Sequence, residues 1–420
     1  MNTTVPSRFR DPIHDPDPVL SAQYRSLFAR HVGPPLPAQV RLLRDALMVG
    51  DPLVDAWLVR ARALPADDGA RLLEQAIAGG IASVVDAPAE LKALFVQLET
   101  VPLWLDAQRL ELGARVSRRA GILGHFVLAD FGLMGGYRSA AVAKTLIRTG
   151  KLRDTAAERL IMTGRFVTAV TEPGDMLPGR PGHAFTIRVR MVHAQVRSAL
   201  LSSGWSSERW GLPINQADTL GTNLLFSIGF LEGCRKWGLH FTDEEVEAVI
   251  HLWRYVGFLI GIDERLLPGD VDSARRALYM VGVSQPDPDG DSVELARALH
   301  AVPLSFARTP LARRIIGAEV ALRLSMTRRI LGEQAVDQLG LPKSRLRALL
   351  PPLIGLISSV DRARQVLPFG DYVAFRVGNF LIKKGEAVLD AELRSREARS
   401  KRGAESSASG AEPHAAAATR

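Results

Sequence analysis

The chain of 420 residues has a single cysteine, Cys234. One cysteine excludes an internal disulfide framework and any cysteine-rich zinc or iron–sulfur site. It also excludes the C-x-x-C-H motif, so any haem would have to bind without a covalent link to the chain. Hydrophobic residues make up 47% and charged residues 23%, an ordinary globular balance, so we expect a folded chain with a large core.

Long hydrophobic runs are also missing. No stretch of about 18 uncharged apolar residues is present to span a membrane. The nearest, 120–137, is broken by His125 and Asp130. The first residues show neither an apolar export segment nor a twin-arginine pair, so we expect a cytoplasmic protein. No strongly basic amphipathic helix stands out, and peripheral membrane contact is left open because a lipid substrate would favour it.

The motifs of several common active sites are absent. The chain has no G-x-x-x-x-G-K-[ST] loop, no G-x-G-x-x-G, no H-E-x-x-H and no G-x-S-x-G. No Glu is followed by His three residues later, which excludes the Glu-x-x-His pairs of a di-iron bundle. The net charge of +8 is spread along the chain without a dense basic run, so we expect no nucleic-acid partner.

Helical periodicity dominates what is present. Apolar residues at i, i+3 and i+4 predict helices at 41–48, 54–63, 69–78, 89–97 and 106–119. Strand alternation is scarce, and short segments with Pro or Gly separate the helices. We therefore predict an all-α fold with one large helical domain. Within it we expect an N-terminal helical extension (1–100), a core (101–275), a C-terminal helical part packed on the core (276–394) and a disordered tail (395–420).

Residues 187–201 predict a helix with one histidine in a distinctive setting. We place His193 on its apolar face, with Arg190 three residues before it and Arg197 four residues after it. The other members of that face are Val189, Val192, Val196 and Leu200. A neutral imidazole in a dry cavity can ligate a metal, and guanidiniums one turn away can hold carboxylates. The alternative is a core histidine beside two solvated arginines.

A second predicted helix, 152–170, places Arg159 and Thr163 one above the other. A fixed cation beside a hydroxyl can polarise and orient oxygen bound to iron. The alternative is an arginine at the helix rim and a threonine bonded to its own helix.

Four segments together resemble a known family. They are Arg159-x-x-x-Thr163, Arg190-x-x-His193-x-x-x-Arg197, Gly211-Leu-Pro-Ile-Asn215-Gln-x-Asp218 and Trp253-Arg-Tyr-Val-Gly-x-Leu-Ile-Gly261-Ile. In order and spacing, from about Trp104 to Pro268, they are similar to the latex-clearing protein / MpaB-type oxygenase family. The His193 helix and the Trp253 segment carry the resemblance as a pair.

The resemblance implies a globin-like helical core around a non-covalent haem b. His193 would match the iron ligand, Arg159 and Thr163 the distal catalytic residues, and Arg190 and Arg197 the arginines near the cofactor. Members of known activity add dioxygen across an alkene of an isoprenoid chain and cleave it. The resemblance therefore implies a haem-dependent dioxygenase whose partners are dioxygen and an apolar unsaturated substrate.

This sequence departs from the family pattern at two places. The latex-cleaving members carry Lys immediately before the distal Thr, where this chain has Met162, a cofactor-binding candidate by position only. They also carry an acid on an upstream helix, whereas 140–149 has neither Asp nor Glu. Proton abstraction from an allylic carbon therefore lacks an evident base. Because no export segment is evident, we expect a smaller isoprenoid or lipid substrate inside the cell rather than an extracellular rubber polymer.

Several alternatives stay open. The chain could bind haem without turnover, as a carrier, sensor or store, or it could be a helical interaction protein without a cofactor. His125 and His183 are other candidate ligands. Asn215 and Asp218 are explained either as the start of the next helix or as cavity residues. Three aromatic residues are expected in the core, where one could line a pocket: Trp253, Phe258 and Phe226.

Overall fold

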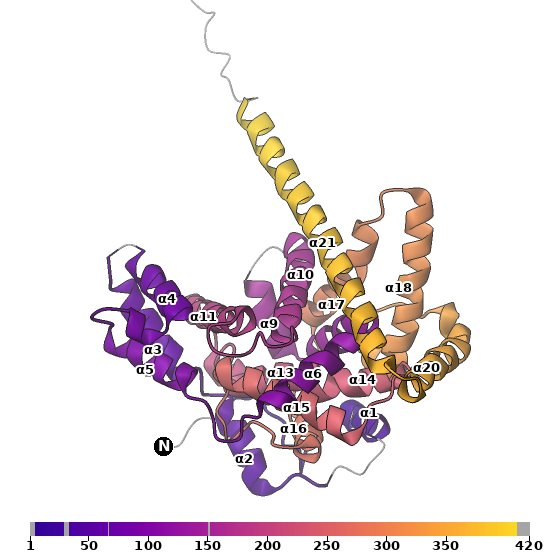
Figure 1. Ribbon diagram of the computed structural model, residues 1–420, viewed down its shortest axis with the longest axis horizontal. Helices are drawn as coiled ribbons and strands as arrows, with labels where there is room; N and C mark the ends of the chain where they lie inside the picture. The colour runs from indigo at the N-terminus through magenta and orange to yellow at the C-terminus, as the bar shows by residue number, and fades with distance from the viewer. Residues whose placement is uncertain (1–4, 29–32, 66, 150–151, 410–420) are drawn as a thin grey trace, which may run out of the picture.

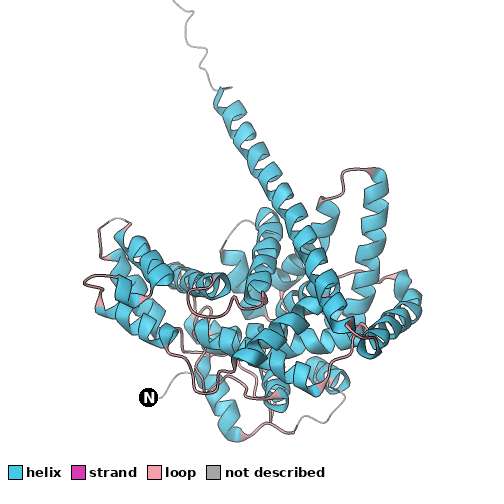
Figure 2. Ribbon diagram, viewed as in Figure 1, coloured by secondary structure: helices cyan, strands magenta, loops and turns pink. Residues whose placement is uncertain are grey.

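The computed structural model describes residues 5–28, 33–65, 67–149 and 152–409. Within these ranges every regular element is a helix and no strand is present (Figure 2). The predicted all-α fold is confirmed.

The N-terminal helices are α1 (Pro18–Leu27), α2 (Pro37–Ala46), α3 (Pro52–Arg62), α4 (Asp68–Gly79), the short 3₁₀ turn η1 (Ile81–Ser83) and α5 (Ala89–Glu99). Of these, α3, α4 and α5 lie together at one end of the molecule, whereas α1 and α2 lie against its body (Figure 1). Asp51 caps α3 by accepting a hydrogen bond from the Val54 N–H, and α4 ends at Gly79, followed by Gly80 at φ +77°. The helices predicted at 41–48, 54–63, 69–78 and 89–97 are therefore confirmed, within a few residues at their ends.

The middle of the chain builds most of the body. Its helices are α6 (Ala107–Arg119), α7 (Gly121–Val127), η2 (Leu128–Leu133), α8 (Met134–Gly136), α9 (Ala140–Arg148), α10 (Leu152–Val170), α11 (Pro181–Ser202), α12 (Ser207–Trp210), α13 (Gln216–Leu224), η3 (Leu225–Gly229), α14 (Phe230–Lys236), α15 (Asp243–Leu259) and α16 (Val271–Val283). Helix α15 lies at the centre and packs closely on α6, where a Cβ added to Gly113 would come 2.3 Å from the Ala248 carbonyl oxygen. Trp253, Phe226 and Phe258 are buried, as expected for core residues.

Two segments within these helices have π-helical geometry. They are η2 and η3, which pack against each other where Gly229 lies beside the Phe131 ring. A π turn inserts one extra residue, changes which side chains face a neighbour, and is frequent at functional sites. The sequence did not predict either segment, because periodicity averages over a single inserted residue.

The C-terminal part completes the fold and ends in a protruding helix (Figure 1). Its elements are α17 (Gly290–Ser305), α18 (Pro310–Leu331), α19 (Glu333–Gln338), the 3₁₀ turn η4 (Arg345–Leu349), α20 (Leu350–Val366) and α21 (Gly370–Ser409). Helix α21 continues through 395–409, where a disordered tail was expected, because Ala, Glu, Arg, Lys and Ser tolerate extension of a helix that is already anchored. The rest of that tail, 410–420, lies outside the described residues.

One continuous cluster of buried apolar side chains runs from Leu20 in α1 to Leu350 in α20. It includes residues from all three helical parts expected from the sequence, and the boundaries at 100 and 275 stay a prediction. In the ranges that the structure describes, no helix is both long and apolar enough to cross a bilayer.

Candidate functional site

A cavity of about 440 Å³ lies between α7, η2, α10, α17, α18 and α21. Most of its lining is aliphatic or aromatic, with Leu128, Leu160, Ile161, Val167, Val302 and Phe306 among the contributors. The polar side chains in the lining are His125, Thr163, Arg165, Arg323, Lys384 and Glu386. An apolar enclosure with a few polar groups suits an apolar ligand that is oriented by one or two contacts.

Helix α10 brings only part of its predicted site to this cavity. Thr163 lines the cavity, one turn after Arg159 on the same helix, as predicted. Arg159 instead donates a hydrogen bond from Nη1 to the Leu146 carbonyl oxygen at 3.3 Å, which ties α10 to α9. Met162 is 47% exposed, and its Sδ lies 3.7 Å from an Arg165 nitrogen. Catalytic roles for Arg159 and Thr163, and a cofactor role for Met162, stay predictions.

Two features of the cavity wall were not singled out as site residues from the sequence. The Arg323 guanidinium pairs with both carboxylate oxygens of Asp130 at 2.6 and 2.8 Å and stacks over the Phe126 ring, 4.2 Å from its centroid. His125 Nδ1 lies 3.3 Å from the Gly121 carbonyl oxygen, so this nitrogen carries the proton and Nε2 is left as an acceptor. Burial lowers the pKa of His125. In the sequence, His125 is only an alternative ligand, and the signal for Asp130 is the interruption of an apolar run.

Helix α11 holds His193 as a half-buried, neutral imidazole. Burial lowers the pKa of His193 to about 4; the positive charge of Arg197 lowers it further, while Asp51 opposes the shift. Among the described residues, His193 has no hydrogen-bond or ion-pair partner. At neutral pH its ring nitrogens are therefore not committed to a protein group.

The two arginines beside His193 are buried in ion pairs with α3. Arg190 donates from Nε and Nη2 to both oxygens of Asp51, at 2.6 and 2.9 Å, and from Nη1 to the Leu259 carbonyl oxygen at 3.1 Å. Arg197 donates to Asp55 at 2.6 Å from Nη2, and from Nη1 to the Ile214 carbonyl oxygen at 3.0 Å. We call these four charged residues, Asp51, Asp55, Arg190 and Arg197, the arginine frame.

The predicted apolar face of this helix is therefore wrong in part. Val192 is 51% exposed, whereas Arg190 and Arg197 are only 2% and 3% exposed. The desolvation cost of burying the two guanidiniums is offset because each one pairs with a carboxylate in bidentate geometry. Their donors are occupied by Asp51 and Asp55, and a contact with cofactor carboxylates stays a prediction.

The other resemblance segments converge on this frame. The Gln216 amide donates from Nε2 to the carbonyl oxygens of Gly50 and Gly261, both at 2.8 Å. Gly261 has φ +91°, and a Cβ there would come 2.2 Å from Oδ2 of Asp51, so only glycine allows this approach. Asn215 caps α13 by accepting a hydrogen bond from the Asp218 N–H, which confirms the helix-start explanation.

Fold and site define an all-helical protein with a neutral, unpartnered histidine, His193, on a rigidly held helix and a large apolar cavity lined by other helices. Residues 118–358 match the sequence model of the catalytic domain described as "ER-bound oxygenase mpaB/B'/Rubber oxygenase", and the chain belongs to this family. The family resemblance stated from the sequence is thereby confirmed.

Two relatives support the assignment. The rubber oxygenase of Streptomyces sp. (strain K30) is 27% identical over 292 residues, which cover 67% of each chain. A solved structure of latex clearing protein LCP in the closed state has a TM-score of 0.60 and 22% identity, covering 80% of this chain and 91% of that one. This structural likeness shows the shared fold.

The donors present fit one kind of metal cofactor better than another. In the part of the chain that the structure describes, no three His, Cys, Asp or Glu side chains are grouped as metal ligands. His193 offers one neutral nitrogen without a competing hydrogen bond. A single protein ligand is enough for an iron that arrives with the four nitrogens of a porphyrin. His193 therefore fits a haem ligand, and the haem itself stays a prediction.

Proposed function

We propose that this chain is a haem b-dependent oxygenase that adds dioxygen to a C=C bond of an apolar unsaturated substrate, such as an isoprenoid. The observation that carries the proposal is the neutral imidazole of His193, which is half-buried and without a protein partner. Family membership supports the oxygenase class, and the relative named rubber oxygenase supports an isoprenoid substrate. Cytoplasmic location stays a prediction.

The residues of this chain would have distinct tasks. His193 would hold the iron, and the arginine frame would fix the position of helix α11. Bound haem would supply the chemistry that activates dioxygen. The aliphatic cavity would exclude water and orient the substrate chain, and the Thr163 hydroxyl would offer a hydrogen bond at its wall. We further propose that Arg159 and Thr163 stabilise charge that develops on oxygen.

The experiment is an absorption spectrum of the purified protein after expression with added haem. We expect a Soret band in the wild type that is lost or shifted in His193→Ala. His183→Ala is a matched control, because His183 is a buried histidine on the same helix, one of the two other ligand candidates, and should leave the band unchanged. A colourless wild type, or an unchanged band in His193→Ala, would contradict the proposal.

A second function, haem binding without turnover, is favoured by two departures from the family pattern. Helix α9 carries no Asp or Glu, and Met162 occupies the position expected for Lys. Anaerobic reduction, followed by oxygen and candidate isoprenoids, separates the two functions. Carbonyl products in mass spectra support the oxygenase, whereas a stable haem spectrum without products supports a carrier, sensor or store.

A further inference from the structure

Helix α21 carries a row of apolar side chains on its outer face. Phe369, just before the helix, and five residues of α21 follow one another at intervals of one, three, four or seven positions and are each between 41% and 81% exposed: Phe369, Val373, Val377, Phe380, Leu381 and Val388. The opposite side of the helix is buried, where Ile382 is 4% exposed and Gly378 packs on the Arg118 carbonyl oxygen. A helix on a water-exposed surface normally has the reverse pattern, with polar residues outside. We call the six residues the α21 stripe.

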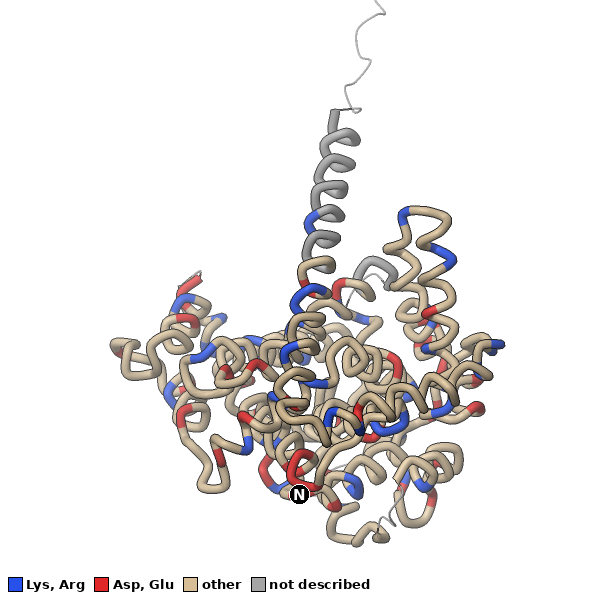
Figure 3. Tube along the Cα trace, turned by 45° about the vertical axis from the view of Figure 1, so that its right-hand side comes forward, with Lys and Arg blue, Asp and Glu red and all other residues tan. Residues whose placement is uncertain are grey.

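The exposed charges beside the stripe are mainly cations. Arg376, Lys383 and Lys384 are exposed, whereas Asp371 is paired with Arg119 and Arg364, and Glu386 lines the cavity. Lys and Arg recur along the described part of α21 in Figure 3. Lys384 lies over the Phe380 ring, 5.4 Å from its centroid, and Arg376 lies over Tyr372 at 5.8 Å. Apolar residues flanked by exposed cations are typical of a helix that lies on an anionic lipid surface.

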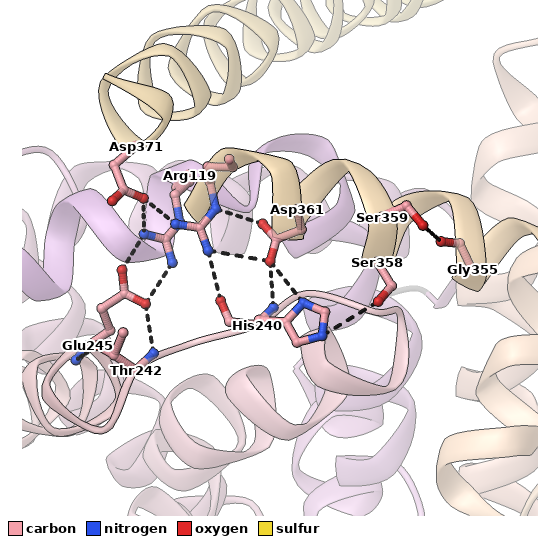
Figure 4. Close-up of polar contacts among 10 residues, drawn as sticks. Arg119, His240, Thr242, Glu245, Gly355, Ser358, Ser359, Asp361 and Asp371 are labelled. Atoms are coloured by element: carbon pink, nitrogen blue, oxygen red, sulfur yellow. Dashed lines mark hydrogen bonds and ion pairs between the residues drawn. The ribbon is translucent and has the colours of Figure 1, made fainter. Parts of the chain in front are cut away.

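A polar network at the base of α21, with buried arginines and an exposed Asp371, fixes which face of the helix points outward (Figure 4). Arg119 of α6 bonds to Glu245 of α15 and, at 3.0 Å, to Asp371 in the first turn of α21. Arg364 of α20 joins the same Asp371 and pairs with Asp361 at 2.8 Å. The helix is therefore held at its base from two neighbouring elements, α6 and α20, and the outward direction of the stripe is part of the fold.

The cavity opens along the same helix. Three residues line the cavity and are also exposed to solvent: Lys384 and Val388 of α21, and Ile122 of the adjoining α7. A residue that both lines a cavity and is exposed lies at the mouth of that cavity. The α21 stripe therefore ends at the cavity mouth, and an apolar molecule could pass between the two without crossing open water.

We propose that the α21 stripe binds the surface of an anionic lipid bilayer and presents the cavity mouth to it. A second copy of this chain is the competing occupant, but pairing two stripes would bring together two surfaces of the same net positive charge. The proposal does not depend on haem, so its failure and the failure of the proposed oxygenase function are separate results. The sequence did not reveal this surface, because Phe375 and Ile382 on the inner face blur the amphipathic pattern.

The test is flotation of the full chain with two kinds of vesicle at 0.15 M salt. One is phosphatidylcholine alone, and the other contains about 30% phosphatidylglycerol. We expect the wild type to float with the anionic vesicles and not with the neutral ones. Val377→Glu/Phe380→Glu should bind the anionic vesicles at least about tenfold more weakly, because it places two carboxylates at the interface.

The matched control is Val59→Glu/Val85→Glu, which changes the net charge equally. Both residues are well exposed, at 71% and 83%, and lie in the N-terminal helical part. This variant should float like the wild type. No flotation of the wild type, equal loss in both variants, or a wild-type dimer that Val377→Glu/Phe380→Glu makes monomeric would each overturn the proposal.

Discussion

An imidazole can donate a lone pair only while it is unprotonated, and burial favours that form for several histidines of this chain, His193 and His125 among them. His193 has a pKa lowered to about 4, and burial also lowers the pKa of His125. They lie in different settings. His193 has no partner, whereas His125 is oriented by the Gly121 carbonyl oxygen in the wall of the cavity. The setting of His193 suits a metal ligand, and the setting of His125 suits a group that accepts a proton.

His125 is therefore our candidate for the base that α9 lacks. We expect His125→Phe to lower the turnover number about a hundredfold with an unchanged Soret band. His300→Phe, the same change at a half-buried histidine outside the cavity lining, should have little effect.

The pH dependence of the rate follows from the same pKa. Burial is the main cause of the lowered value, with Arg118 lowering it further and the Gly121 carbonyl and Glu386 opposing. The proton-accepting form should therefore dominate above pH 6.5. The wild-type rate should be flat from pH 8 to 6.5 and fall at lower pH, as the imidazole takes up a proton. A rate that rises on acidification would argue against His125 as the base.

At the scale of elements, the contact between α3 and α11 decides where His193 lies. Asp51 is the N-cap of α3, and its carboxylate pairs with the guanidinium of Arg190, which is 2% exposed. A buried ion pair adds little net stability, but removal of one partner leaves a charge without compensation. The pair therefore specifies how the two helices meet.

Asp51→Ala should lower the free energy of unfolding by about 3–5 kcal/mol, measured by urea denaturation. Asp51→Ala/Arg190→Met should recover part of this loss, because no unpaired charge then remains. Equal losses in the two variants would show that the helix cap, worth about 1 kcal/mol, and local packing matter more than the ion pair.

Sequence patterns predicted the positions of the helices better than they predicted which side of each helix is buried. Helices α10 and α11 follow from local spacing, and the cap at Asn215 follows from the residues beside it. The burial of Arg190 could not be predicted, because its partner Asp51 lies 139 positions away and local hydrophobicity places an arginine outside. The cavity could not be predicted either, since it depends on where α21 returns to the body.

At the scale of the whole molecule, the cavity is a product of long-range assembly. Its walls come from helices between α7 and α21, more than 250 positions apart. Of the residues that the sequence marked for function, Thr163 of α10 and His125 of α7 line it. Glycine leaves room in this wall, because a Cβ added to Gly164 would meet nothing within 4 Å.

Gly164→Leu should therefore fill part of the cavity without a clash. We expect the affinity for farnesol, measured by displacement of a polarity-sensitive dye, to fall about tenfold. Stability should rise by roughly 0.5–1 kcal/mol, because leucine favours a helix over glycine. Gly355→Leu, in α20 and equally unobstructed, is the control that should gain stability and keep the affinity. Unchanged affinity in Gly164→Leu would place the ligand elsewhere.

The arginine frame also sets a lower limit on how far this chain can be shortened. The span that matches the family model begins at residue 118, yet Asp51 and Asp55 belong to helix α3. A recombinant fragment trimmed to that span would leave two guanidiniums inside the protein with no counter-ion, and the helix that carries His193 would lose its contact with α3. The span of the catalytic-domain model and the smallest autonomous folding unit of this chain are therefore different lengths.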